Sequence, residues 1–218
     1  MCVACRARLT QRSFSSVGPW AVVALLAVGI HALSELLQLS VMIWAFSTLL
    51  ELGYARSDAT ALYAESLFLL GMVQAIAWVF GVVGFLTWQF QAVRIATQLE
   101  VSRLSPRWAL LSWFIPGLNL FKPYQVLRDL WRDLGGESSR TLLILAWWCL
   151  GLLTLTLGLG HELLLQVDEV VNIKTFVLRA TQLAYTAMLV LTAVLCIGVV
   201  RHIQRRLTQV KRELVDGT

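Results

Sequence analysis

Charged residues are scarce in this sequence, and their scarcity indicates the class of protein. Only 14% of the 218 residues are Asp, Glu, Lys or Arg, whereas 58% are hydrophobic, and the mean hydropathy is +0.71. Soluble globular domains carry about 25% charged residues, so a soluble protein is excluded. We expect an all-α integral membrane protein with one membrane domain and no separate soluble module.

Motifs that mark common enzymes are also missing. The sequence has no phosphate-binding glycine loop, no nucleophile elbow and no paired acid–base carboxylates. Its four cysteines indicate no disulfide framework, because Cys149 and Cys196 lie inside apolar runs. We therefore expect a protein that is not an enzyme and that carries no cofactor or metal.

Four apolar runs are long enough to cross a bilayer. These predicted spans cover about residues 20–45, 66–88, 141–160 and 181–200. The first run is too long for a cleaved signal peptide and lacks a small-x-small cleavage site, which favours a retained signal anchor. Pro19 suits the first turn of its helix. Residues 1–18 are thus predicted to be a basic N-terminus, 19–200 the membrane domain and 201–218 a basic tail.

Positive charge is concentrated in the segments that would lie on one side of the membrane. Fifteen of the 18 Lys and Arg residues fall there, in residues 1–18, 94–107, 122–140 and 201–218. By the positive-inside rule this side is the cytoplasm, so both termini are predicted to be cytoplasmic and the protein to lie in the cell (inner) membrane. The same distribution argues against nucleic acid as a partner, because these residues occupy short loops instead of one polar face.

The segment from Trp108 to Phe121 has no charge but is too short to cross a bilayer. Its 14 residues would span roughly 21 Å as a helix, against roughly 30 Å of hydrocarbon. Pro116 and Gly117 permit a turn at its middle. We therefore predict a re-entrant or interfacial segment, 108–134, that enters and leaves on the same side.

Two amphipathic helices are predicted on that side. Residues 123–134 alternate apolar Leu127, Leu130 and Trp131 with charged neighbours, which indicates an interfacial helix. The tail after residue 200 keeps an apolar stripe, predicted to lie on the membrane or to pack against the loops.

The region between the second and third runs carries a pattern of tryptophan and proline at several fixed spacings. The pattern comprises Trp88, Arg94, Pro106, Trp108, Trp113, Pro116, Asn119, Pro123, Tyr124 and Trp131. It resembles the bacterial membrane-protein family of domain of unknown function 4328, strongly over about residues 84–140. The resemblance implies the four-span plan and a membrane location, and it implies no activity. A plainer interpretation is that Asn119 caps a turn and that Trp108, Trp113 and Trp131 anchor the membrane interface.

Three polar residues of the first run share one helix face. His31, Glu35 and Gln38 are spaced i, i+4 and i+7, and an ionisable residue inside a span is costly unless it faces a partner or water. The face can fix helix packing through Gln74, serve transport or sensing, or support catalysis; packing is the simplest of these.

Two other patterns carry less information. Cys2 and Cys5 have zinc-knuckle spacing without a second ligand pair, which leaves a shared zinc, lipidation or no role open. His161 and Glu162 lack the second histidine of a metalloprotease motif, so we interpret them as a pair in an outer loop.

Two hypotheses of function follow. The first is a non-enzymatic multi-pass membrane protein that contacts the lipid bilayer and binds a partner protein or anionic lipid through its cytoplasmic amphipathic helices. The alternative is a small transporter or channel-like protein whose polar pathway is lined by His31, Glu35 and the re-entrant segment.

Overall fold

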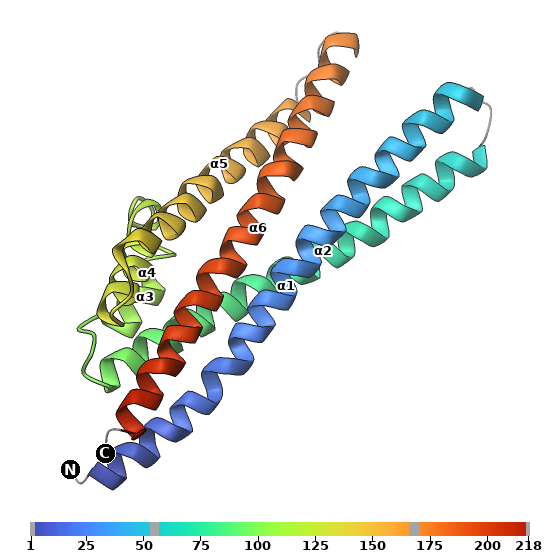
Figure 1. The fold of residues 1–218 in the computed structure, drawn as a ribbon. Coiled ribbons are helices and arrows are strands. Elements are labelled where there is room, and N and C mark those ends of the chain that lie inside the picture. The colour runs from blue at the N-terminus through green and yellow to red at the C-terminus, as the bar shows by residue number, and fades with distance from the viewer. Residues whose placement is uncertain (1–2, 53–56, 166–170, 217–218) are drawn as a thin grey trace.

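The computed structural model describes residues 3–52, 57–165 and 171–216, and these ranges form helices joined by turns (Figure 1). The long helices are α1 (Val3–Leu52), α2 (Ser57–Gln98), α5 (Thr141–Leu165) and α6 (Val171–Asp216). Between α2 and α5 lie α3 (Pro106–Leu111), η1 (Leu118–Leu120), α4 (Lys122–Asp133) and η2 (Ser138–Arg140). The predicted all-α class with short helices between the second and third long helices is confirmed.

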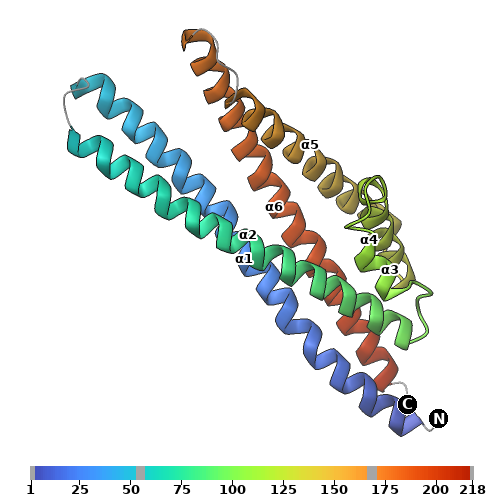
Figure 2. The same cartoon turned by 180° about the vertical axis from the view of Figure 1, so that it is seen from behind.

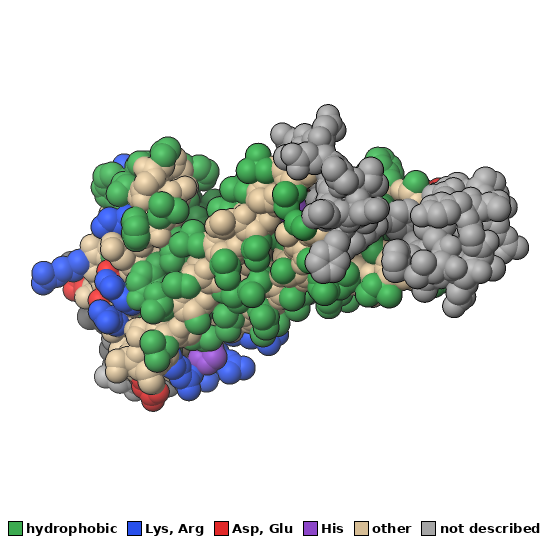
Figure 3. Space-filling view, turned by 90° about the horizontal axis from the view of Figure 1, so that it is seen from above, with side chains coloured by type: hydrophobic (Ala, Val, Ile, Leu, Met, Phe, Trp, Pro, Cys, Tyr) green, Lys and Arg blue, Asp and Glu red, His purple; other side chains and the backbone are tan. Residues whose placement is uncertain are grey.

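Each long helix contains a stretch that is long and apolar enough to cross a membrane. The four stretches are Val17–Trp44, Ala64–Gln98, Ser138–Leu164 and Ala180–Glu213. Large apolar side chains cover their outer surface, such as Phe68, Met72, Ile76 and Val79 on α2, and hydrophobic atoms dominate the middle of the molecule in Figure 3. Such a surface is stable against lipid, so the protein is a multi-pass membrane protein.

The long helices pair as two antiparallel hairpins, α1 with α2 and α5 with α6, and α6 also packs against α1 (Figures 1 and 2). The hairpins diverge away from the end where α1 begins and α6 ends. That end also holds α3 and α4, and we call it the basic end because Lys and Arg side chains gather on it (Figure 3). At the far end α1 ends and α2 begins, and α5 ends and α6 begins (Figure 1).

Glycine allows α1 and α2 to approach closely. A Cβ atom at Gly84 would lie 3.0 Å from the backbone nitrogen of Ala24, and one at Gly81 would lie 3.7 Å from the Ala27 side chain. In a membrane, where helix association depends on packing, small residues at such positions bring backbones together.

The path of the central segment agrees with the predicted return to the same side. Gly117 adopts the left-handed region (φ 81°) between α3 and η1, and Pro123 lies in the first turn of α4. Gly135, in the left-handed region (φ 72°), then follows the end of α4. Because α2 ends and α5 begins at the basic end (Figure 2), the segment between them does not cross the bundle.

The start of the first helix differs from the sequence-based expectation. Helix α1 begins at Val3 and contains Pro19 in its interior, where a proline removes one backbone hydrogen bond and crowds the carbonyl group of the preceding turn. Helix α6 runs without a break from the membrane stretch into the basic tail, as the continuous apolar stripe of the tail predicts. Cys2 and the side chain of Cys5 lie outside the described residues.

Candidate functional site

Residues 106–133, which we call the central hairpin, pack beside the first turns of α5 (Figure 1). The indole N–H of Trp148 donates a hydrogen bond to the carbonyl oxygen of Leu120 over 2.9 Å. Since Trp148 follows the first residue of α5 by seven positions, the turn of the hairpin lies roughly 10 Å along α5. The turn of the hairpin therefore reaches only a short way along α5.

Aromatic rings fill the space between the central hairpin and the long helices. Phe85 is at the centre of this aromatic cluster, with its ring centroid 5.5 Å from Trp88 and 5.7 Å from both Trp113 and Trp147. Trp148 extends the cluster, 5.6 Å from Trp113. Tilted and edge-on ring pairs at these separations add stability beyond the burial of area.

Hydrogen bonds fix the tryptophans of the family pattern. The Trp88 indole, which is fully buried, donates to Gln204 Oε1 of α6 over 3.1 Å. Trp113 donates to Gln89 Oε1 over 2.8 Å, and Trp131 donates to the Glu137 carbonyl over 2.9 Å. Each of these bonds satisfies an indole N–H that would be costly to bury without an acceptor. Trp88 and Trp131 therefore act in the core and not as membrane anchors.

The apolar face of α4 lies against protein, which corrects the prediction of an interfacial helix facing the membrane. Leu127, Leu130 and Trp131 are all buried. The stripe on α6 is buried too, through Ile203, Leu207 and Val210. Apolar residues that recur with the helical period of 3.6 predict that one helix face lies in an apolar environment, but they do not distinguish lipid from protein.

Arg206 joins these two helices, a role that the sequence did not predict. Its Nε donates to the Leu134 carbonyl at the end of α4 over 2.8 Å. The carbonyl groups of a last helical turn lack partners within the helix, and a guanidinium satisfies them and complements the helix dipole. The hydroxyl of Ser102, which follows α2, also binds the end of α4 by donating to Asp133 Oδ2 over 2.5 Å.

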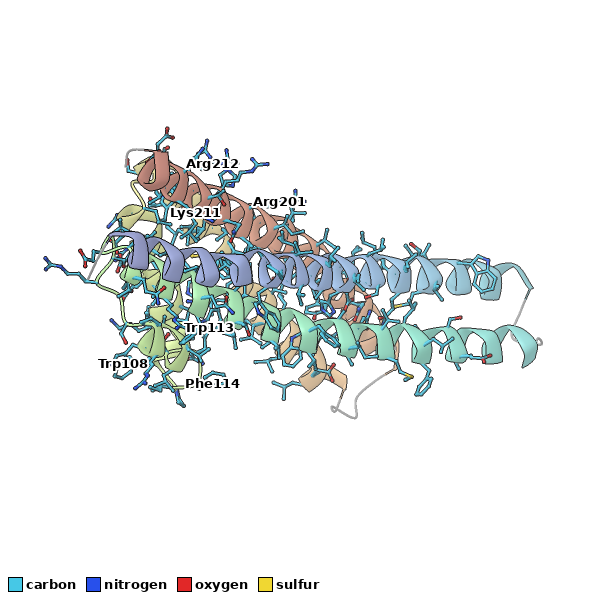
Figure 4. All side chains as sticks on the ribbon, turned by 90° about the horizontal axis from the view of Figure 1, so that it is seen from below. Trp108, Trp113, Phe114, Arg201, Lys211 and Arg212 are labelled. Carbon is cyan, nitrogen blue, oxygen red and sulfur yellow. The ribbon has the colours of Figure 1, made fainter. Side chains whose placement is uncertain are left out.

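The outer side of the central hairpin is apolar and exposed. Trp108, Phe114 and Phe121 are 59%, 66% and 65% exposed, and Arg107 and Lys122, which flank the uncharged segment, are exposed as well. We call the exposed apolar set the hairpin tip; its members are Trp108, Leu111, Phe114, Leu118, Leu120 and Phe121. Figure 4 shows Trp108 and Phe114 on one side of the bundle, opposite Arg201 and Arg212.

The remaining residues of the family pattern surround this tip. Pro106 starts α3, Pro116 is exposed in the turn, Asn119 is half-buried in η1, and Arg94 is exposed at the end of α2. Tyr124 is half-buried beneath the guanidinium of Arg128, 5.5 Å from the ring centroid. A hydrogen bond to Asp129 raises the pKa of Arg128 above its ordinary value.

The polar residues of α1 lie much farther into the bundle. Gln74 Nε2 of α2 donates to Gln38 Oε1 over 2.6 Å, so these two side chains bond to each other, whereas the sequence suggested them as partners of His31 and Glu35. Glu35 is only 6% exposed and faces protein. The ring of His31 lies beside the backbone of Gln74, and its Nδ1 is buried without a hydrogen-bond partner in the described part of the chain.

The structure does not bring these polar residues together with the central hairpin. Gln89, which contacts the hairpin through Trp113, lies 15 positions from Gln74 along α2, or roughly 22 Å. The two sets of residues therefore lie at different depths of the bundle. His161 is separate again, with Nδ1 3.0 Å from Thr181 Oγ1. No group of three or more His, Cys, Asp or Glu side chains suited to a metal occurs among the described residues.

Comparison with known proteins gives a family and no further relative. No curated protein and no solved structure matches the chain. The family model described as Domain of unknown function (DUF4328) matches residues 53–205, which is most of the chain and includes the central hairpin and the aromatic cluster. Helix α1 lies before the matched residues. The chain therefore belongs to the DUF4328 family, as a member with four helices able to span a membrane.

Proposed function

We propose that this protein is a non-enzymatic membrane protein that binds anionic lipid at the cytoplasmic face through the hairpin tip. The observation that carries the proposal is the exposed tip between two exposed basic residues, Arg107 and Lys122. The concentration of Lys and Arg at the basic end supports its placement in the cytoplasm.

Lipid suits this surface better than a partner protein does. The apolar faces of α4 and α6, which could have docked a partner helix, are already buried in the bundle. The tip lies beside a membrane-spanning part of α5, where its aromatic side chains can enter the lipid while the two basic side chains reach the headgroups. Each Lys or Arg near an anionic surface contributes about 1 kcal/mol.

The test compares phosphatidylglycerol with phosphatidylcholine on the detergent-solubilised full chain by native mass spectrometry. We expect the wild type to retain phosphatidylglycerol preferentially. The double variant Arg107→Gln/Lys122→Gln should weaken that retention about 30-fold, as the loss of about 2 kcal/mol implies.

The matched control is Arg201→Gln/Arg212→Gln, which removes the same charge from the opposite side of the bundle (Figure 4). An equal loss in both variants would contradict a site at the tip, because it would show that only net charge matters. A different outcome would identify a protein partner in place of lipid. In that outcome the wild type shows no lipid preference, and a second protein co-purifies with it in a fixed ratio and is lost on Phe114→Ser.

A further inference from the structure

A second region, in the middle of the membrane, holds polar side chains that the packing leaves without partners. Glu35 is buried, and it forms no hydrogen bond or ion pair with any residue that the structure describes. His31, one helical turn away on the same face, is 14 positions from Val17 and 13 from Trp44, the ends of its candidate span, so it lies roughly 20 Å from each end. A charge at such depth is costly unless it is paired or neutralised.

Helix α6 contributes to the same region. Tyr185 lies within electrostatic range of Glu35, and Thr186 is 1% exposed with its hydroxyl unpartnered within the described residues. A helical threonine usually donates to the carbonyl four residues earlier, as Thr192 does to Met188. Thr186 shares a buried face of α6 with Leu189 and Ala193, and α6 packs against α1. Its hydroxyl is thus buried in the bundle without a partner among the described residues.

The groups that face Glu35 narrow the choice of ligand. They are His31 on α1, Tyr185 on α6 and, beyond Tyr185, the exposed Glu162 on α5; on α2 the neighbour of His31 is Gln74. None of these side chains is a lysine or arginine, so among the described side chains no permanent positive charge balances the carboxylate. A single proton would leave the pair neutral overall, either on Glu35 or as a carboxylate beside an imidazolium.

We infer that Glu35 and His31 form a proton-binding site inside the membrane, in which the buried carboxyl of Glu35 takes up a proton and His31, one helical turn away, is the neighbouring titratable group. This site is independent of lipid binding at the hairpin tip. It makes α1 a functional helix of the bundle, in addition to its packing against α2 and α6.

Infrared difference spectroscopy of the full chain in lipid nanodiscs tests the site. Between about pH 9 and about pH 5 the wild type should show the carbonyl band of a buried protonated carboxyl. Glu35→Gln should abolish this band, whereas the same change at the exposed Glu65 should leave it. A wild type without the band, or a band that survives Glu35→Gln, would overturn the site.

Two further measurements test the composition of the site. His31→Gln should move the midpoint of the band by about one pH unit or more, because a neighbouring ionisable group shifts titration by that amount; an unchanged midpoint would contradict a site formed by both residues. Replacing choline chloride by sodium chloride in the buffer should leave the midpoint of the wild-type band unchanged. A midpoint that falls as sodium rises would instead identify a metal cation as the ligand.

Discussion

The basic end and the polar middle of this bundle differ in whether their buried polar groups have hydrogen-bond partners. At the basic end, the indole groups of Trp88, Trp113, Trp131 and Trp148 all donate to acceptors, and of the described side chains there only Gln89 Nε2 remains buried without a partner. In the middle, Glu35, His31 Nδ1 and the Thr186 hydroxyl have none among the described residues. Satisfied polar groups stabilise a fold, whereas unsatisfied ones reduce stability and are retained where a ligand uses them.

The difference separates two tasks within one small membrane protein. The aromatic cluster and the Arg206 contact hold the central hairpin, α2 and α6 together. The two pairs of long helices, α1 with α2 and α5 with α6, diverge toward the middle of the bundle (Figures 1 and 2). The polar atoms there remain available to a ligand. We therefore expect substitutions at the basic end to change stability, and substitutions in the middle to change protonation with little effect on stability.

The largest expected effect concerns which end of the bundle faces the cytoplasm, and it is an all-or-none difference in thiol labelling. In a variant without native cysteines, Arg107→Cys and Lys122→Cys should both resist a membrane-impermeant thiol reagent in intact cells and both react after the membrane is opened. The charge distribution is the reason, since reversing it places most basic residues outside. Reaction of only one position in intact cells would mean that the central hairpin crosses the membrane.

A methyl group beside Trp131 tests how tightly the basic end is packed. A Cβ at Gly136 would lie 2.1 Å from the Trp131 ring, whereas one at Gly160 has nothing within 4 Å. Gly136→Ala should lower the free energy of unfolding by about 2–3 kcal/mol through overpacking, measured by denaturation in mixed micelles. Gly160→Ala is the control and should leave it within about 0.5 kcal/mol; equal effects would remove the contrast between the two ends.

Loss of one indole donor should have an intermediate effect. Trp88→Phe leaves the half-buried Gln204 without its 3.1 Å hydrogen bond, which should cost about 1–3 kcal/mol. Trp78→Phe on the same helix is the control, because Trp78 is exposed. A Trp88 variant as stable as the Trp78 variant would show that the bond to α6 contributes nothing.

The pair Gln38 and Gln74 should show the smallest effect. A double-mutant cycle with Gln38→Leu and Gln74→Leu is expected to give a coupling of about 0.6 kcal/mol, typical of hydrogen bonds between membrane helices. Equilibrium unfolding of the four proteins in mixed micelles measures it. A coupling of several kcal/mol would make the middle as structurally important as the aromatic cluster and would weaken the contrast drawn above.

Prediction of the sites from sequence succeeded for local features and failed for partners. The i, i+4, i+7 spacing placed His31, Glu35 and Gln38 on one face of α1, and Gln38 does meet Gln74. Nothing in the sequence pointed to Gln204 as the acceptor of Trp88, 116 positions away, or to Arg206 at the end of α4. Thr186 and Tyr185 were missed as well, because isolated hydroxyl residues in an apolar run are common and give no periodic signal.

The sequence by itself determined the four apolar helices, the uneven distribution of charge and the turn at Pro116–Gly117, since length, hydropathy and backbone freedom are local properties. Only the tertiary structure decided which apolar faces meet lipid and which meet protein. Leu127 on α4 and Phe114 at the tip are equally apolar, yet the first is buried and the second exposed. Lipid and protein interior offer an apolar side chain nearly the same environment, so packing geometry and the hydrogen bonds of buried tryptophans make that choice.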